Sequence, residues 1–232
     1  MTGLMEDFIN RSRAKEDARI ESTDGQGPQG SAAWLFERVG YVTASRFNDI
    51  IAKTKAGKPT AAREKYLWEC VVGRLTGLPQ DHYTSAALQW GGDQEIPSRM
   101  AAEAASGYII EEVGFIKHPT IKWIGGSPDG LIGEDGGWES KSPYNSAVHL
   151  QTVLGGMPEE HMAQIQGLLW ITGRKWWDYQ SFDPRLPEPL NCFRQSIERD
   201  SAYIAARAAE INLFAHTVQA LVARLADYKE AA

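Results

Sequence analysis

Two acids and a lysine lie close together in the middle of the chain, at Asp129, Glu139 and Lys141. The tetrapeptide 127–130, Ser-Pro-Asp-Gly, is typical of a turn, because proline fixes φ and glycine tolerates a tight corner. Residues two apart in a strand point to one face, so Glu139 and Lys141 are expected to share a face. If the turn brings Asp129 beside that face, two carboxylates and one ammonium group converge.

These side chains suit the hydrolysis of a phosphodiester. Two carboxylates can hold Mg²⁺, which keeps coordination positions for water and for a phosphate. The ion would polarise a phosphodiester oxygen and lower the pKa of a bound water, while the lysine would hold that water or offset charge on the phosphate. Acyl transfer fits less well, because it requires a nucleophile beside a base. On spacing alone, a polar hairpin with a Glu–Lys surface pair remains the simpler interpretation.

Helices and strands must position these residues, and both are predicted in a mixed order. Periodicity and capping predict helices over 43–52, 61–77, 93–107, 159–173 and 198–229, and strands over 108–119, 121–134, 136–142 and 175–184. A polar helix is predicted over 1–22, followed by a Gly/Pro/Ser linker that ends at residue 31. The order of elements favours a mixed α/β fold that begins at residue 32.

The composition is that of an ordinary globular chain, with 232 residues, of which 43 % are hydrophobic and 23 % charged. No run of about 18 apolar residues occurs, so no membrane span is expected, and the charged N-terminus lacks the apolar region of a signal peptide. Cys70 and Cys192 are far apart, and the five histidines lack ligand spacing, so zinc is not expected. A reduced, cytosolic protein is the simplest interpretation.

The charges are distributed unevenly along the chain. The formal net charge of −6 argues mildly against a nucleic-acid-binding protein, because phosphates are neutralised by Lys and Arg. However, residues 37–65 hold seven cations against three acids, whereas residues 93–112 are strongly acidic. This separation is consistent with a basic face for a polyanion and an acidic pocket for a cation. A solvated surface with local charge fluctuation is the alternative.

Several motifs in order along the chain resemble those of a known nuclease group. They are Pro128-Asp129 with Glu139-Ser140-Lys141, Trp34 with Arg38 and Gly40, Thr-Ala-Ser at 43–45, and the stretches 87–95, 127–131, 162–172 and 182–185. Together they resemble the bacteriophage lambda exonuclease (YqaJ-like) group of the PD-(D/E)xK superfamily. The resemblance implies a restriction-endonuclease-like core, in which helices flank a mixed central sheet, with a long C-terminal helix. It implies one nuclease domain over 32–232, preceded by a helical extension and linker over 1–31.

The resemblance also implies the residues of the catalytic site. The metal ligands would be Asp129, Glu139, Glu95 and the backbone carbonyl of Ser140, and Lys141 would be the catalytic lysine. Glu95 is also explained as a first-turn acid favoured by the helix dipole. Gln164 would face the site from its helix. Gln166 is rotated about 200° from Gln164, so only one of the two can join the site, and Gln164 is favoured.

Four further residues are implied to bind the DNA end. Arg38, Ser45 and Ser127 would hold the 5′-terminal phosphate, and Leu88 would act as a wedge between the terminal base pairs. Arg38 is also explained as a surface arginine and Ser45 as a helix cap. At Ala147 the lambda enzyme has a basic residue, so one phosphate contact of the group is missing here.

The activity that the resemblance implies is a Mg²⁺-dependent 5′-to-3′ exonuclease, with Mn²⁺ as a substitute. It would degrade linear double-stranded DNA to mononucleotides and leave 3′ single-stranded tails for recombination. The implied partners are two further copies in a homotrimeric ring and a single-strand annealing recombinase, with no membrane. A phage or prophage protein in the cytoplasm of a bacterial host is implied. The alternatives are an endonuclease on the same fold, since a fold does not define an activity, and a degenerate DNA-end-binding module.

Overall fold

A five-stranded mixed sheet is the framework of the computed structural model, which describes residues 27–79 and 85–228. The strand order is β2-β5-β6-β7-β8, with β6 parallel to β7 and the other pairs antiparallel. The strands are β2 (Ile110–Glu111), β5 (Gly130–Ile132), β6 (Gly136–Lys141), β7 (Trp176–Phe182) and β8 (Cys192–Glu198). The helix predicted over 1–22 lies outside the described residues.

A second, three-stranded sheet has the order β1-β4-β3. Its strands are β1 (Val42–Thr43), β3 (Ile116–Lys117) and β4 (Ile124–Gly126), with β1 parallel and β3 antiparallel to β4. The chain passes from β4 in this small sheet to β5 in the large sheet through residues 127–129. The turn predicted at 127–130 therefore links two sheets.

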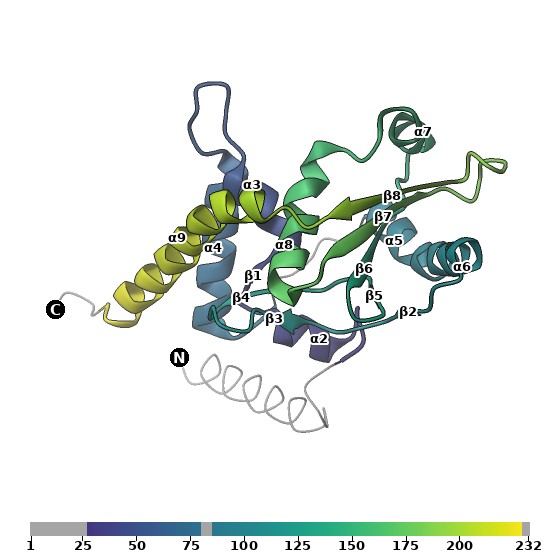
Figure 1. The fold of residues 1–232 in the computed structure, drawn as a ribbon. Coiled ribbons are helices and arrows are strands. Elements are labelled where there is room, and N and C mark those ends of the chain that lie inside the picture. Colours follow the sequence, from purple (N-terminus) through teal and green to yellow (C-terminus); the bar gives the residue numbers. More distant parts are fainter. Residues whose placement is uncertain (1–26, 80–84, 229–232) are drawn as a thin grey trace.

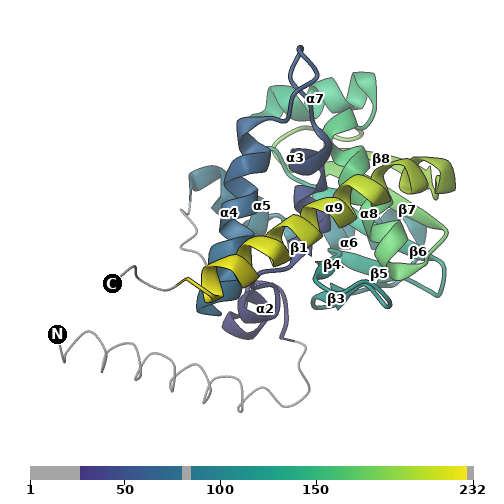
Figure 2. The same cartoon turned by 90° about the vertical axis from the view of Figure 1, so that its left-hand side faces the viewer.

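Helices flank the large sheet and form a separate layer beside it (Figures 1 and 2). They are α2 (Ala32–Glu37), η1 (Ala44–Arg46), α3 (Phe47–Ile51), α4 (Ala61–Thr76), α5 (Ala86–Asp93), α6 (Glu95–Ser106), α7 (Ser146–Gly155), η2 (Glu159–His161), α8 (Met162–Thr172) and α9 (Ser201–Ala226). The predicted long C-terminal helix is thus present as α9, and the mixed sheet with flanking helices is confirmed. No helix in the described ranges is both long and apolar enough to cross a bilayer.

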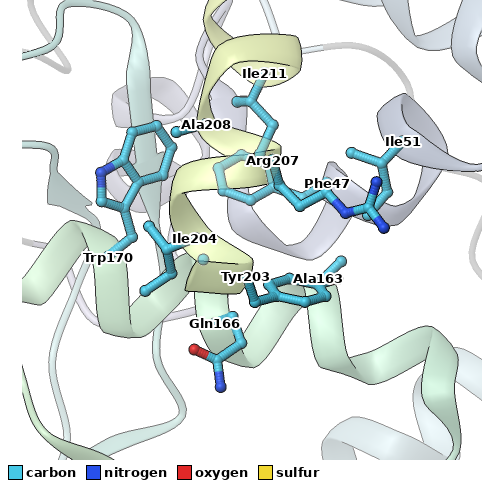
Figure 3. A pocket seen from close by; sticks show the side chains of 11 residues that line it. Phe47, Ile51, Ala163, Gln166, Trp170, Tyr203, Ile204, Arg207, Ala208 and Ile211 are labelled. Atoms are coloured by element: carbon cyan, nitrogen blue, oxygen red, sulfur yellow. The ribbon is translucent and has the colours of Figure 1, made fainter. Parts of the chain in front are cut away.

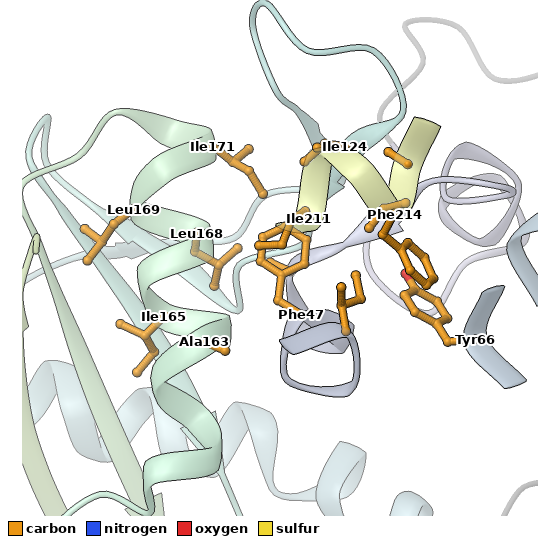
Figure 4. Packing of buried hydrophobic residues seen from close by; sticks show 14 of the residues in the cluster. Phe47, Tyr66, Ile124, Ala163, Ile165, Leu168, Leu169, Ile171, Ile211 and Phe214 are labelled. Atoms are coloured by element: carbon orange, nitrogen blue, oxygen red, sulfur yellow. The ribbon is translucent and has the colours of Figure 1, made fainter. Parts of the chain in front are cut away.

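The main core lies where α8 packs against α3 and α9, and α4 packs against the same two helices (Figure 4). Phe47, Leu168 and Phe214 are all within 1 % of complete burial. Gly167 permits the close approach of α8 to α3, because a Cβ atom there would lie 2.5 Å from the Phe47 ring. This packing fixes α8 beside the sheet, and with it the residues that α8 presents to β6.

Several predicted boundaries are wrong where tertiary contacts divide a run. The predicted strands over 108–119 and 121–134 are each two short strands, and the two members of each pair belong to different sheets. Sequence periodicity detects extended backbone but not the sheet in which it pairs. The sequence did not predict the helices α5 and α7 or the strand β8. The two helices are short, and tertiary packing rather than local propensity stabilises them.

Candidate active site

The hairpin of β5 and β6 brings the two acids together. Gly130 pairs with Trp138 across the hairpin, so Asp129 lies beside the segment that holds Glu139. The Ser140 backbone N–H donates a hydrogen bond of 2.8 Å to Asp129 Oδ2. The predicted convergence of the two carboxylates therefore follows from the register of this hairpin.

Glu139 is the centre of the cluster and is only 1 % exposed. Its Oε1 accepts hydrogen bonds of 2.5 Å from Lys141 Nζ and from Gln164 Nε2. Its Oε2 is buried and has no hydrogen-bond partner within the described part of the chain. The Lys141 side chain, 30 % exposed, connects this buried carboxylate with the surface.

The electrostatics of the cluster follow from burial and close charges. Burial and the neighbouring Asp129 raise the pKa of Glu139 to about 7, against the opposing effect of Lys141. Burial also raises the pKa of Asp129. For Lys141, burial disfavours the charged form, but Glu139 and Asp129 outweigh it and raise the pKa above the ordinary value. The protein thus holds two acids in a place where ionisation costs free energy unless more positive charge is supplied.

Glu95 is the first residue of α6 and faces the same cluster. Burial is the largest cause that raises the pKa of Glu95 to about 7, and the charge of Asp129 is the second. The charge of Asp129 acts on Glu95 because the two acids lie near each other. A hydrogen-bonded contact holds α6 against the sheet: Ser98 Oγ lies 2.6 Å from Ser140 Oγ and accepts from Gln180 Nε2 at 2.8 Å. Ser98 and Gln180 are fully buried positioning residues that no sequence signal identified.

The donor set fits a hard divalent cation that is only partly enclosed by protein. No three His, Cys, Asp or Glu side chains in the described ranges form a ready-made metal cluster. Two carboxylates, one of which has an unpartnered buried oxygen, are nevertheless what Mg²⁺ uses when water and substrate phosphate complete its sphere. Asp129 and Glu139 would hold the ion, with Glu95 beside them, and the Ser140 carbonyl stays a predicted ligand. Such an ion would polarise a phosphodiester and acidify a bound water.

The two glutamines of α8 have different environments, as the helical angle between them indicated. Gln164 donates to Glu139, as described above. Gln166 is 2 % exposed, donates to the Glu198 carbonyl at 2.8 Å and accepts from the Asp200 N–H at 2.9 Å. Of the two, Gln164 contacts Glu139, and Gln166 joins α8 to the end of β8.

Two aromatic residues, Tyr179 and His161, border the cluster without having been assigned a role from the sequence. Tyr179 pairs with Glu139 across β6 and β7 and is 1 % exposed. His161 stacks on Tyr179 with ring centroids 5.4 Å apart. Burial and the charge of Lys141 lower the pKa of His161 to about 4, so its imidazole is neutral at neutral pH. The spacing of three residues between His161 and Gln164 was the available signal, because it places both on one helix face.

The residues predicted to bind a phosphate lie around the small sheet. Thr43 of β1 pairs in parallel with Gly125 of β4, and Ser45 and Ser127 each follow that pair by two residues. The Trp34 indole N–H donates to Ser127 Oγ at 2.9 Å, and the Arg38 guanidinium lies over the Trp34 ring, 4.1 Å from its centroid. These contacts connect Arg38 with Ser127 through Trp34 and place Ser45 at the same end of the sheet.

Arg38 and Ser45 both present hydrogen-bond donors beside the small sheet. Burial lowers the pKa of Arg38, and its guanidinium pairs with no carboxylate in residues 27–79 or 85–228. Ser45 is exposed, and its Oγ lies 3.3 Å from Thr43 Oγ1. Leu88 is 65 % exposed on α5. Ala147 is exposed in the first turn of α7, where a basic residue was expected.

A crevice where α3, α8 and α9 meet is not a competing site (Figure 3). Its lining is mostly apolar, including Phe47, Trp170 and Ile211, and its free volume is about 10 Å³. That volume is about that of one water molecule. This crevice therefore offers no alternative to the β5–β6 hairpin as a site for chemistry.

The mixed sheet with flanking helices has the restriction-endonuclease-like fold of the exonucleases to which this chain is similar. The chain is similar to LHK-Exo, an alkaline exonuclease from Laribacter hongkongensis, with 39 % identity over 84 % of this chain and 96 % of that one and a TM-score of 0.77. A structure of LHK-Exo in complex with dAMP gives 38 % identity, the same coverage and a TM-score of 0.78. A phage-related exonuclease from Haemophilus somnus 129PT has the same fold, with 15 % identity, coverage of 80 % and 96 %, and a TM-score of 0.64.

The chain belongs to the YqaJ-like viral recombinase domain family, whose model matches residues 33–175. The predicted family resemblance is thereby confirmed. No curated protein matches the chain closely enough to extend this comparison. The matched range lies within the predicted domain over 32–232, whose limits stay a prediction.

Proposed function

We propose that this nuclease is a Mg²⁺-dependent exonuclease that degrades linear duplex DNA from its 5′ ends and leaves 3′ single-stranded tails. The observation that carries the proposal is Glu139, a buried carboxylate with one oxygen bound by Lys141 and Gln164 and the other without a partner. Such an oxygen costs free energy unless a ligand satisfies it. A metal ion bound together with substrate phosphate would satisfy this oxygen, and Mn²⁺ would substitute for Mg²⁺.

The protein's own groups have separate roles in this reaction. Lys141 holds the attacking water and offsets the charge that develops on the phosphate, because its side chain is partly exposed and its ammonium group contacts the buried acid. Gln164 orients Glu139 by donating to Oε1. Glu95 adds a third acid on the side of Asp129. The dAMP held by LHK-Exo supports a deoxynucleotide product.

The 5′ polarity rests on the residues around the small sheet. Arg38 is a cation without a carboxylate partner among the described residues, and Ser45 and Ser127 offer hydroxyl groups at the same end of that sheet. A terminal 5′-phosphate would accept hydrogen bonds from all three groups. Leu88, exposed on α5, would separate the terminal base pairs.

The test is to incubate the full-length protein with linear and with covalently closed circular duplex DNA, with Mg²⁺ or with EDTA. We expect degradation of the linear DNA only, dependent on Mg²⁺ and faster from 5′-phosphorylated than from 5′-hydroxyl ends, with mononucleotides as product. Intact linear DNA would overturn the proposal, and nicking of the circle would replace it with an endonuclease.

The proposal extends to the assembly in which the enzyme works. We propose a homotrimeric ring around the duplex that acts with a single-strand annealing recombinase in the cytoplasm of a bacterial host; membership of the viral recombinase domain family supports this proposal. Light scattering of the full-length protein is expected to give three times the monomer mass. A monomeric mass would rule out the ring.

A further inference from the structure

Tyr144 is an exposed aromatic side chain close to the catalytic lysine. It lies three residues after Lys141, between the end of β6 and the start of α7, and is 56 % exposed. Three residues of extended chain span at most roughly 11 Å, so its Cα lies within about one to two nucleotide lengths of Lys141. An exposed aromatic at this position is available to whatever occupies the site.

The backbone of Tyr144 is held in place by Arg185. The Arg185 Nη2 donates to the carbonyl oxygens of Tyr144, at 3.0 Å, and Pro143, at 3.3 Å. Arg185 is itself fixed by the buried carboxylate of Asp183, with hydrogen bonds of 2.8 and 2.9 Å. The exposed ring therefore projects from a rigid support, which lowers the entropic cost of binding.

Trp90 joins this support to the other side of the site. Its ring meets the Tyr144 ring edge-on, with centroids 6.4 Å apart, and the Arg185 guanidinium lies over it at 4.2 Å. Trp90 belongs to α5, which leads directly into Glu95 at the start of α6. Trp90 and Tyr144 thus connect the two chain segments that carry Glu95 and Lys141.

We propose that the Tyr144 ring stacks on the base of a nucleotide that adjoins the phosphodiester cut at Lys141. Aromatic rings are sequence-tolerant stacking platforms, because every base has a π-face. The charge of Arg185 is already balanced by Asp183, so this corner recognises a base rather than a phosphate. The inference rests on the proposed nuclease function and deepens it by naming how the nucleotide, beyond its phosphate, is held.

The experiment compares the removal of the first nucleotide from 5′-phosphorylated linear duplexes in Mg²⁺. Three substrates are used: a normal duplex, a duplex with an abasic first nucleotide and a duplex with an abasic second nucleotide. These two nucleotides adjoin the first phosphodiester bond that is cut. The proteins are the full-length wild type, Tyr144→Ala, Tyr144→Phe and, as matched control, Tyr228→Ala, which changes another exposed tyrosine beyond the end of α9. The readout is kcat/KM at subsaturating DNA, with circular dichroism to confirm folding.

With normal DNA, Tyr144→Ala is expected to lower kcat/KM about tenfold, which corresponds to about 1.4 kcal/mol. With one of the two abasic substrates this difference disappears, since the base that stacks is gone. Tyr144→Phe and Tyr228→Ala should behave as wild type on all substrates. Three outcomes would overturn the stacking role. Tyr144→Ala could lower kcat/KM undiminished on both abasic substrates, or have no effect on normal DNA, or Tyr144→Phe could itself lower kcat/KM. Inactive wild type would instead refute the proposed nuclease function, and the inference with it.

Discussion

Two buried polar clusters on neighbouring parts of the same sheet differ in how fully they are satisfied. On the β7 side, His149 of α7 is completely buried, and its ring nitrogens contact Ser181 Oγ at 2.8 Å and the Leu190 carbonyl at 2.7 Å. On the β6 side, Glu139 is equally buried, yet its Oε2 lacks a partner in the described chain. Both clusters fix backbone positions, but the second leaves an acceptor unmet.

The difference distinguishes a buried carboxylate that has room for a further ligand from a buried imidazole whose two ring nitrogens both have partners. A buried polar group with all its hydrogen-bond partners stabilises the folded state. A buried carboxylate with an unpartnered oxygen lowers the free energy of unfolding until a ligand binds that oxygen. The same contrast recurs between Gln166 and Gln164, and between Arg46, which pairs with Asp49 and Glu69, and Arg38, which pairs with no acid in the described part of the chain. The following predictions test this contrast.

The largest effect is expected for Glu139→Gln compared with His149→Ala. Loss of the carboxylate removes a metal ligand, so nuclease activity should fall by at least about a hundredfold, while the thermal midpoint is unchanged or higher because a buried charge has gone. His149→Ala should retain activity when folded but lose about 1–3 kcal/mol of unfolding free energy, because two buried partners are left unsatisfied. Linear-DNA degradation and urea unfolding measure the two quantities. If His149→Ala inactivates a stably folded enzyme, the contrast is wrong.

A smaller effect is expected for the glutamines of α8. Gln164→Ala should lower activity roughly 10- to 100-fold with little loss of stability, because Gln164 orients a metal ligand. Gln166→Ala should lower stability by about 1–3 kcal/mol with activity retained, because it leaves the Glu198 carbonyl and the Asp200 N–H unpaired. The same two assays decide. Equal effects of both variants on activity would remove the special role of Gln164.

Arg38 and Arg46 offer a third comparison, in which we expect about a tenfold change in the preference for 5′-phosphorylated ends. Arg38→Met should reduce the preference for 5′-phosphorylated over 5′-hydroxyl ends by about tenfold, since a hydrogen bond to a charged group contributes about 1.5–3 kcal/mol. Arg46→Met should leave that preference intact, because Arg46 is engaged by two carboxylates. The ratio of degradation rates on the two substrates is the measurement. An unchanged ratio in Arg38→Met would exclude Arg38 from phosphate recognition.

The smallest effect concerns pH and metal-free stability. The pKa values of Glu139 and Glu95 rise from 4.5 to about 7 on folding. Their stabilising contribution is therefore fully present below pH 4.5 and is lost as pH rises through about 7. In EDTA, the thermal midpoint should decrease as the pH rises from 6.5 to 8. The pKa of His161 is lowered to about 4, so the opposite effect of His161 on stability lies below this pH window. Glu139→Gln should flatten this decline and Mg²⁺ should offset it. A flat wild-type profile would contradict the assigned shifts.

The sequence by itself determined the local relations. The two-residue spacing placed Glu139 and Lys141 on one face of β6, and helical rotation separated Gln164 from Gln166. Glycines marked the helix ends, as at Gly77, Gly107 and Gly173, which all adopt the left-handed conformation. The order of motifs along the chain predicted the family. These features depend on neighbours within a few residues, which is the range that periodicity and capping report.

Only the tertiary structure decided which groups are buried and which remain unpaired. The contact between Ser98 and Ser140 spans 42 residues, that between Gln180 and Ser98 spans 82, and both join α6, which begins at Glu95, to the sheet. The support of Tyr144 likewise joins α5, the end of β6 and Arg185. Such pairings depend on how sheets and helices pack, and no local pattern encodes the partner across so long a separation. Thus the sequence named the acids and the lysine, and the packing left Glu139 buried with one oxygen free to bind.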